Sequence, residues 1–123
     1  MQNVSTGNAA TETRSTRGWF IGHFISDDHL RKTNDVEVKW GIHPKGDKND
    51  GGFLANRAAT TMSILISGKF RLWFRDENTT EQIDLDAPGR YAVWAPGVPH
   101  DWEAIEDSVV FTVRWPSVPK DQQ

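Results

Sequence analysis

The sequence of 123 residues predicts an all-β fold, either an antiparallel barrel or a jelly roll. Apolar and polar residues alternate in several short runs, which is the pattern of strands that bury one face. Turn signals separate these runs at regular intervals, including Ser67-Gly68, Pro88-Gly89 and Pro96-Gly97. The runs amount to about eight strands, and short strands with regularly spaced turns are typical of sandwiches and barrels.

The chain is predicted to form one domain at residues 18–120, preceded by a flexible tail at residues 1–17. No long compositional break divides the sequence, and a domain of this size can bury a core without disulfides or metals. The tail is rich in Ser, Thr, Asn and Ala and has almost nothing to bury. We therefore expect a single packed β-domain after the tail.

Charge and composition argue against several classes of function. The net charge is −3 and no basic stripe stands out, so we expect no nucleic-acid partner. The chain has no cysteine, hence no disulfide, no thiolate zinc site and no cysteine nucleophile.

The polar N-terminus lacks the apolar segment of a secretory signal, and no later run is as long as a membrane span. We therefore expect a cytoplasmic protein with no membrane partner.

The first strands are expected at residues 18–25 and 35–43. The earlier run is apolar and aromatic, and His23 within it is interpreted as a packed, hydrogen-bonded residue. Four alternating apolar residues of the later run should form its buried face: Val36, Val38, Trp40 and Ile42. The residues between them form a polar face, where His43 is expected to be a solvated residue at the strand end.

The clearest hairpin is predicted at residues 60–74, with its turn at Ser67-Gly68. Apolar residues alternate with charged ones after the turn, as in a strand with one solvated face. Further short strands are expected at residues 82–85, 91–94 and 108–115, after which the chain is rich in proline.

The stretch from Gly89 to His100 resembles a known family motif. Gly89 is followed, after six residues, by Pro96-Gly97-Val98-Pro99-His100, which is similar to the second sequence motif of the cupin superfamily. The strand that closes on Gly68 resembles the end of the first cupin motif. The resemblance implies a small antiparallel double-stranded β-helix, an RmlC-like jelly-roll barrel with a pocket inside. It also implies that a metal could be held there, as in many cupins.

The metal site that the resemblance implies is incomplete in this chain. In metal-binding cupins the first motif resembles His-X-His followed by a Glu seven residues before the closing glycine. Counting back from Gly68 puts Thr61 at the Glu position and Leu-Ala-Asn-Arg, residues 54–57, at the histidine positions. Only His100 remains, and tight transition-metal sites usually need about three protein donors or more. We therefore predict no cofactor and no tightly bound metal.

An alternative function is a cupin-type enzyme. It could be metal-dependent and dioxygenase-like, with a divalent metal held by His43, His100 and a carboxylate such as Asp47 or Asp50. It could also be a metal-free isomerase or epimerase with His100 as the general base. Asp101 or Glu103 would then have to orient His100, although strand alternation points Asp101 away from it.

The barrel interior is expected to bind a small organic ligand that the sequence does not identify. Aromatic walls exclude water, while Arg, His and hydroxyl groups fix an anion or a hydroxyl-bearing molecule. Eight residues are candidates for ligand contact: Trp40, Arg57, Thr61, Ser63, Trp94, His100, Trp102 and Arg114. We predict small-molecule binding as the function, and we expect about half of these side chains to be packing residues.

A third alternative is an interaction module without a ligand. In that case Trp19, Trp73 or Trp115 would be buried in the interface of a homodimer. A homodimer is compatible with all three functions, and we expect one.

Overall fold

The computed structural model describes residues 3–26 and 29–123, and in this part of the chain eight strands follow a short N-terminal helix. The elements in chain order are α1 (Ala9–Glu12), a 3-10 turn (Arg14–Thr16), β1 (Trp19–Ile21), β2 (Glu37–His43), β3 (Thr60–Ser67), β4 (Phe70–Arg75), β5 (Thr80–Leu85), β6 (Tyr91–Trp94), β7 (His100–Ala104) and β8 (Ser108–Trp115). The predicted all-β fold is confirmed. Neither described segment contains a helix of the length and apolar character needed to cross a membrane.

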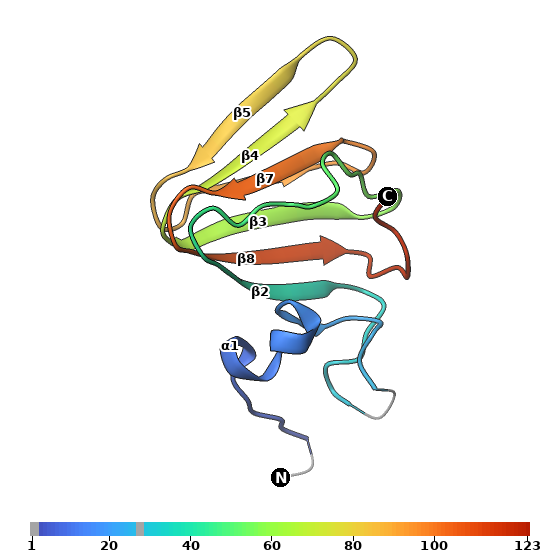
Figure 1. Ribbon diagram of the computed structural model, residues 1–123. Coiled ribbons are helices and arrows are strands. Elements are labelled where there is room, and N and C mark those ends of the chain that lie inside the picture. Colours follow the sequence, from blue (N-terminus) through green and yellow to red (C-terminus); the bar gives the residue numbers. More distant parts are fainter. Residues whose placement is uncertain (1–2, 27–28) are drawn as a thin grey trace.

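The strands form two antiparallel sheets that pack against each other (Figure 1). The larger sheet has the order β1-β2-β8-β3-β6, and the smaller has the order β5-β4-β7. Because each strand directs alternate side chains to one face, apolar residues of both sheets meet between the layers. The buried core consists of Leu65, Phe70, Leu72, Leu85, Trp94, Ala104 and Val110.

Ser67-Gly68 is a corner between the two sheets and not the turn of a hairpin. β3 pairs with β6 and β8 in the larger sheet, whereas β4 pairs with β5 and β7 in the smaller one. Both strands and the turn lie where we predicted them, but the hairpin pairing at residues 60–74 is wrong. Gly68 has a φ of 92°, and a Cβ there would lie 2.1 Å from the carbonyl oxygen of Asp107. Hairpins and corners both favour glycine, so local sequence does not distinguish them.

The inner face of β2 is the polar one, contrary to the expectation from sequence. His43 is only 7% exposed, so it is not the solvated residue that we expected, whereas Ile42 is 55% exposed. Trp40 lies on the outer side, with its ring 6.4 Å from that of Phe111. The period of two was predicted correctly, but hydrophobicity identified the wrong inner face because the barrel interior holds a polar cavity.

The N-terminal segment packs on the edge of the larger sheet. We predicted a flexible tail at residues 1–17, but in its described part α1 lies against β2 (Figure 1) and Thr13 is buried. The carbonyl oxygen of Thr13 accepts a hydrogen bond of 2.9 Å from the backbone N–H of Gly18. The carbonyl oxygen of Gly18 in turn accepts one of 2.9 Å from Trp40. These contacts fix the start of the domain to β2.

The C-terminal residues belong to the fold as well, beyond the predicted boundary at residue 120. Ala55 and Gln123 exchange two backbone hydrogen bonds of 2.7 and 2.9 Å. The Asp121 carboxylate accepts hydrogen bonds from the backbone N–H groups of Ala58 and Ala59 at 2.7 and 3.0 Å. These bonds hold the C-terminus across the loop that leads into β3.

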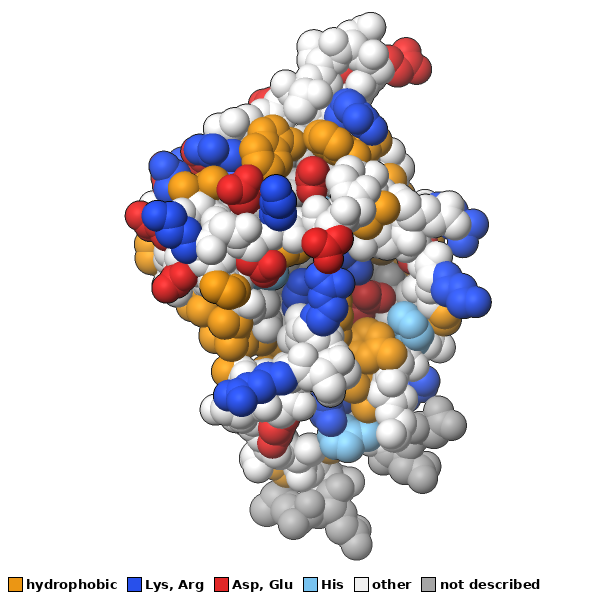
Figure 2. Space-filling model, viewed as in Figure 1, with side chains coloured by type: hydrophobic (Ala, Val, Ile, Leu, Met, Phe, Trp, Pro, Cys, Tyr) orange, Lys and Arg blue, Asp and Glu red, His pale blue; other side chains and the backbone are white. Residues whose placement is uncertain are grey.

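The outer face of the larger sheet carries several exposed apolar side chains: Ile42, Ile66, Tyr91 and Val93. Of the three tryptophans that we considered for a dimer interface, Trp115 is exposed while Trp19 and Trp73 are half-buried. The homodimer stays a prediction. On the face that Figure 2 shows, basic and acidic side chains are interspersed, without an extended basic stripe.

Replacing Gly68 with alanine should destabilise the fold for two reasons: the left-handed backbone conformation and a steric clash of the added Cβ. Gly89 is a matched control, because its φ is 90° and an added Cβ would meet no atom within 4 Å. We expect Gly89→Ala to lower the free energy of unfolding by about 1–2 kcal/mol. Gly68→Ala should lower it by roughly a further 1–3 kcal/mol because of the clash with Asp107. Urea unfolding measures both, and equal losses would contradict the close approach at the corner.

Candidate functional site

A small cavity of about 170 Å³ lies between the two sheets. Seven strands, all except β5, and segments near both chain ends contribute to its walls. Its polar lining consists of Arg17, Lys39, His43, Asn49, Thr61, Ser63, His100, Thr112, Arg114 and Gln122. Its apolar lining consists of Trp19, Leu54, Phe70, Leu72, Trp94, Trp102 and Val110.

Six of the eight predicted contact residues line this cavity: Thr61, Ser63, Trp94, His100, Trp102 and Arg114. Trp40 and Arg57 do not, so our placement of these two in the barrel interior is wrong. Trp40 faces outward from β2, and Arg57 is exposed. The backbone N–H of Arg57 donates to the carbonyl oxygen of Asp121 at 3.1 Å, and the adjoining Gln122 lines the cavity instead.

Three further lining residues were not predicted from the sequence: Arg17, Lys39 and Gln122. Lys39 could have been found, because it lies between Glu37 and His43 on one polar face of a predicted barrel strand. No such signal marks Arg17 and Gln122, because local sequence does not predict where the segments near the two chain ends pack against the barrel. Arg17 has a φ of 58° in the turn before β1, and it lines both the barrel cavity and the hollow between the N-terminal segment and β2.

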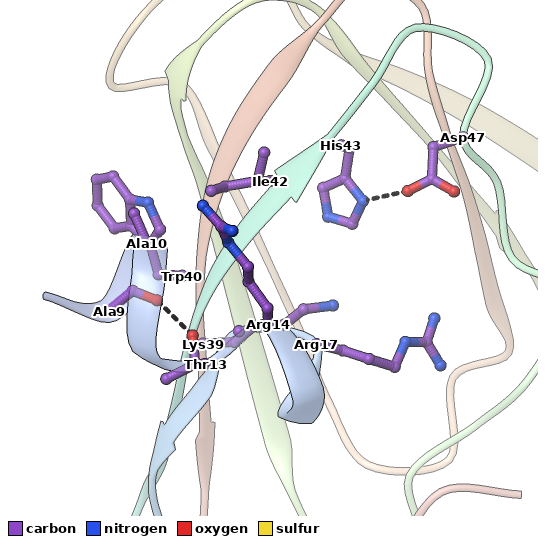
Figure 3. Close-up of a pocket in the computed structure, with 11 residues that line it drawn as sticks. Ala9, Ala10, Thr13, Arg14, Arg17, Lys39, Trp40, Ile42, His43 and Asp47 are labelled. Atoms are coloured by element: carbon purple, nitrogen blue, oxygen red, sulfur yellow. Dashed lines mark hydrogen bonds and ion pairs between the residues drawn. The ribbon is translucent and has the colours of Figure 1, made fainter.

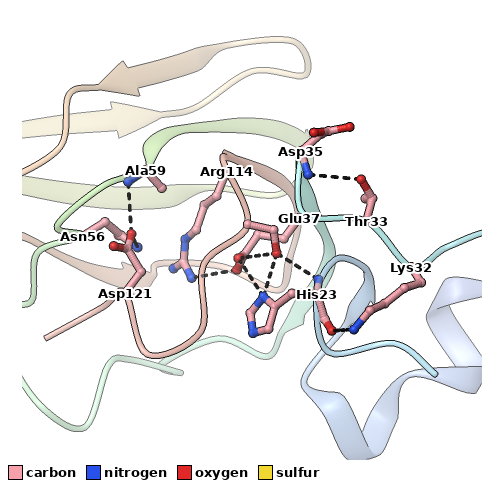
Figure 4. Close-up of polar contacts among 10 residues, drawn as sticks. His23, Lys32, Thr33, Asp35, Glu37, Asn56, Ala59, Arg114 and Asp121 are labelled. Atoms are coloured by element: carbon pink, nitrogen blue, oxygen red, sulfur yellow. Dashed lines mark hydrogen bonds and ion pairs between the residues drawn. The ribbon is translucent and has the colours of Figure 1, made fainter. Parts of the chain in front are cut away.

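Arg114 is held at the cavity wall by a buried polar network (Figure 4). Its Nη1 lies 3.5 Å from Oε2 of Glu37, which stands opposite it in the β2–β8 ladder. Ser117 Oγ donates to Oε1 of Glu37 at 3.0 Å and lies 2.7 Å from Nδ1 of His23. The prediction that His23 is a packed, hydrogen-bonded residue is confirmed. Burial lowers the pKa of Arg114, and the charge of Glu37 opposes this effect.

Two positively charged side chains of the cavity, Arg114 and Lys39, lie over the ring of Trp19. The guanidinium carbon of Arg114 lies 4.7 Å from the ring centre, and Nζ of Lys39 lies 5.7 Å from it. Cations at such distances are attracted by the negative face of the indole. Burial, followed by the charges of Arg114 and Arg17, lowers the pKa of Lys39 to about 8.

His43 forms a hydrogen-bonded pair with Asp47 at the cavity wall (Figure 3). Its Nδ1 donates to Oδ2 of Asp47 at 2.8 Å, while the ring packs against Phe70 and Trp102 at centroid distances of 5.1 and 4.7 Å. A Cβ on Gly41 would lie 2.7 Å from Nε2 of His43, so glycine leaves room for the ring. Burial lowers the pKa of His43, with the hydrogen bond to Asp47 opposing it.

His100 lies on the other side of the cavity, and no carboxylate of the described residues is paired with it. Its Nδ1 lies 3.1 Å from the carbonyl oxygen of Val98, and since a carbonyl only accepts, Nδ1 carries the proton. Its Nε2 then accepts a hydrogen bond of 3.2 Å from the amide of Gln122. Burial is the largest cause of the lowered pKa of His100. The ring therefore stays neutral at neutral pH.

The polar lining does not fit a divalent metal. Both ring nitrogens of His100 are engaged in hydrogen bonds, and His43 lies within the electrostatic influence of Lys39 and Arg17, which disfavour a further cation. Thr61 occupies the position where metal-binding cupins would have a Glu. Within residues 3–26 and 29–123, no three His, Cys, Asp or Glu side chains come together as a metal site. That the protein binds no metal stays a prediction.

The two lowered histidine pKa values should make the fold less stable in mild acid. The unfolded chain takes up protons near pH 6.5, whereas burial keeps His43 and His100 neutral to lower pH. The free energy of unfolding should therefore fall as the pH drops below about 6.5, by at most about 1.4 kcal/mol per pH unit for each histidine. Urea unfolding between pH 5 and 7 measures the slope. An equally steep slope in the His43→Gln, His100→Gln double variant would contradict this assignment.

The sequence matches no family model and no curated protein. The fold, however, is similar to that of several solved structures. Oxalate decarboxylase from Bacillus subtilis aligns with a TM-score of 0.60 and 16% identity over 73% of this chain, which spans only 24% of the decarboxylase chain. KdgF from Halomonas sp. aligns with a TM-score of 0.54 and 19% identity over 70% of this chain and 74% of its own.

A conserved protein from Klebsiella pneumoniae with a double-stranded beta-helix domain aligns with a TM-score of 0.56 and 18% identity. The alignment covers 69% of this chain and 66% of that one. At these identities the likeness concerns the fold alone. Together with the two-sheet architecture, it shows that this chain has the cupin-type fold, a double-stranded β-helix.

Proposed function

We propose that the barrel cavity binds a small organic anion with a carboxylate group. The observation that carries this proposal is the charge of the lining: Arg17, Lys39 and Arg114 face the cavity, and no Asp or Glu is among its described lining residues. Arginine and lysine are the side chains that recognise carboxylates in proteins. A bound anion would also reduce the repulsion among the three cations.

Unused hydrogen-bonding groups around the cavity support an anionic or polar ligand. Arg114 Nε, Thr61 Oγ1 and Trp94 Nε1 are buried and have no hydrogen-bond partner among the described residues, and all three residues line the cavity. A buried polar group without a partner costs about 1–3 kcal/mol. A ligand that brings acceptors into the cavity would reduce this cost.

The size and the walls of the cavity limit the ligand to a small molecule. Its volume of about 170 Å³ is below the range of roughly 300–1,000 Å³ that is usual for drug-sized ligands. Trp94 and Trp102 provide apolar walls that strengthen electrostatic contacts by excluding water. A carboxylate with a short apolar or carbonyl-bearing chain fits this combination.

Proton transfer is a second candidate function, favoured by the His43–Asp47 pair. A carboxylate on Nδ1 orients a histidine so that Nε2 can act as a base, as in many catalytic sites. The sequence led us to consider His100 as the base, but Val98 and Gln122 occupy both of its ring nitrogens. A metal-free isomerase built on this barrel would therefore use His43.

If His43 is a base, the protein should catalyse exchange of the methyl protons of pyruvate in D₂O, measured by NMR. Asp47→Asn should slow this exchange by tenfold or more, because the imidazole loses its orienting carboxylate. Asp50→Asn is the matched control, since Asp50 is an exposed acid in the same loop. An exchange rate no higher than that of buffer, or equal losses in the two variants, would exclude this second function.

For the anion-binding function, we expect lactate and pyruvate to bind to the protein while neutral lactamide does not. Arg17→Gln should weaken lactate binding by tenfold or more, because a charge-assisted hydrogen bond contributes about 1.5–3 kcal/mol. Titration calorimetry, with tryptophan fluorescence as a second signal, measures the affinity.

Arg14→Gln is the control for this experiment. Arg14 is an exposed arginine of the same N-terminal segment, but it lines only the hollow outside β2 and not the barrel cavity. Equal losses in Arg14→Gln and Arg17→Gln, or binding of lactamide as tight as that of lactate, would contradict the proposal. Elemental analysis of the same preparation tests the prediction of no tightly bound metal.

A further inference from the structure

Lys39 lies where the barrel cavity meets a second hollow. This outer hollow of about 470 Å³ lies between the N-terminal segment and β2 (Figure 3), and Lys39 lines both spaces. Its Nζ contacts the face of Trp19, but it has no hydrogen bond or ion pair to any residue within 3–26 and 29–123. A lysine that is largely buried without an acidic partner is unusual, because burial of an ammonium without a counter-charge is costly.

The charges that act on Lys39 come from every element around it. Arg114 on β8 and Arg17 in the N-terminal segment are both positive, and Arg114 shares the ring of Trp19 with it. Asp47, from the loop after β2, is the acid whose charge opposes them, but Asp47 is already hydrogen-bonded to His43. The two arginines and burial therefore favour the neutral amine.

Burial, together with the charges of Arg114 and Arg17, makes Lys39 a much better nucleophile than a surface lysine at neutral pH. Its pKa falls from 10.5 to about 8. Because each pH unit is a factor of ten, the neutral fraction of this amine is roughly 300 times that of an ordinary lysine. Desolvation next to other cations is a recognised way to activate a lysine for attack on a carbonyl group.

We propose that the Lys39 amine forms an imine with the carbonyl group of a small 2-oxo acid whose carboxylate is bound by Arg17 and Arg114. This inference rests on the proposed function and adds the class of ligand. A 2-oxo acid places its carbonyl next to its carboxylate. The carboxylate can therefore lie between the two arginines while the carbonyl carbon faces the amine that they flank.

The reaction is a reversible condensation without oxidation or reduction. The lone pair of Nζ attacks the carbonyl carbon, a C–N bond forms, and the carbonyl oxygen takes a proton to give a carbinolamine. The nitrogen then loses its second proton, the C–O bond breaks, and the hydroxyl group leaves as water. One amine and one carbonyl compound thus give one imine and one water, with solvent accepting and returning the protons.

Trapping with pyruvate and sodium cyanoborohydride tests the inference near pH 7. The reductant converts the imine to a stable secondary amine, so intact mass should show one reduced pyruvyl group, and peptide mapping should place it on Lys39. We expect labelling of Lys39 to be at least tenfold faster than that of the exposed Lys45. Lactate, which has the carboxylate but no carbonyl, should slow the labelling of Lys39 and leave that of Lys45 unchanged.

Two variants serve as controls. Lys39→Arg keeps the positive charge but has no nucleophilic amine, so it should show no preferred label. Lys45→Arg should be labelled on Lys39 as fast as the unmodified protein. If lactate and pyruvate bind but Lys39 is labelled no faster than Lys45, the imine is refuted and the binding function stands. If neither acid binds and Lys39 shows no preferred label, the binding function and the imine both fail.

Discussion

The buried ion pair between Glu37 and Arg114 is the interaction on which the site depends. The two residues stand opposite each other in the β2–β8 ladder, so the pair joins two neighbouring strands of the larger sheet. A buried charge without a partner costs several kcal/mol, roughly 3–5 when one member of a pair is removed. Glu37 therefore stabilises a guanidinium at the cavity wall, and hydrogen bonding to Ser117 fixes the carboxylate in turn.

Because Glu37 pairs with Arg114 and is not among the residues that line the cavity, the lining itself keeps an excess of positive charge. Lys39 and Arg17 add to it. Burial lowers the pKa of Lys39, and the charges of Arg114 and Arg17 lower it further. Such an arrangement stabilises a bound anion more than it stabilises the empty barrel, which is typical of functional sites. The polar inner face of β2 thus belongs to the cavity wall and not to the apolar core, which supports the proposed anion site.

The two chain ends complete the cavity that the strands begin. The N-terminal segment passes over the edge of β2 and brings Arg17 to the lining. At the opposite terminus Asp121 anchors the chain on the loop before β3, and Gln122 reaches His100. Both contacts join residues that are far apart in sequence, and both come from segments with little apolar character. Removal of either end would open the cavity without removing a strand.

The sequence by itself determined the all-β class, most of the strand positions and six of the eight cavity residues that we predicted. These features follow from local rules, since the period of two and the turn residues act within a few positions. Only the tertiary structure decided the pairing across Gly68, the inward face of β2 and the places of Arg17, Trp40 and Arg57. Each of these depends on which distant segments pack together, and a polar barrel interior reverses the hydrophobic pattern that normally marks the inside.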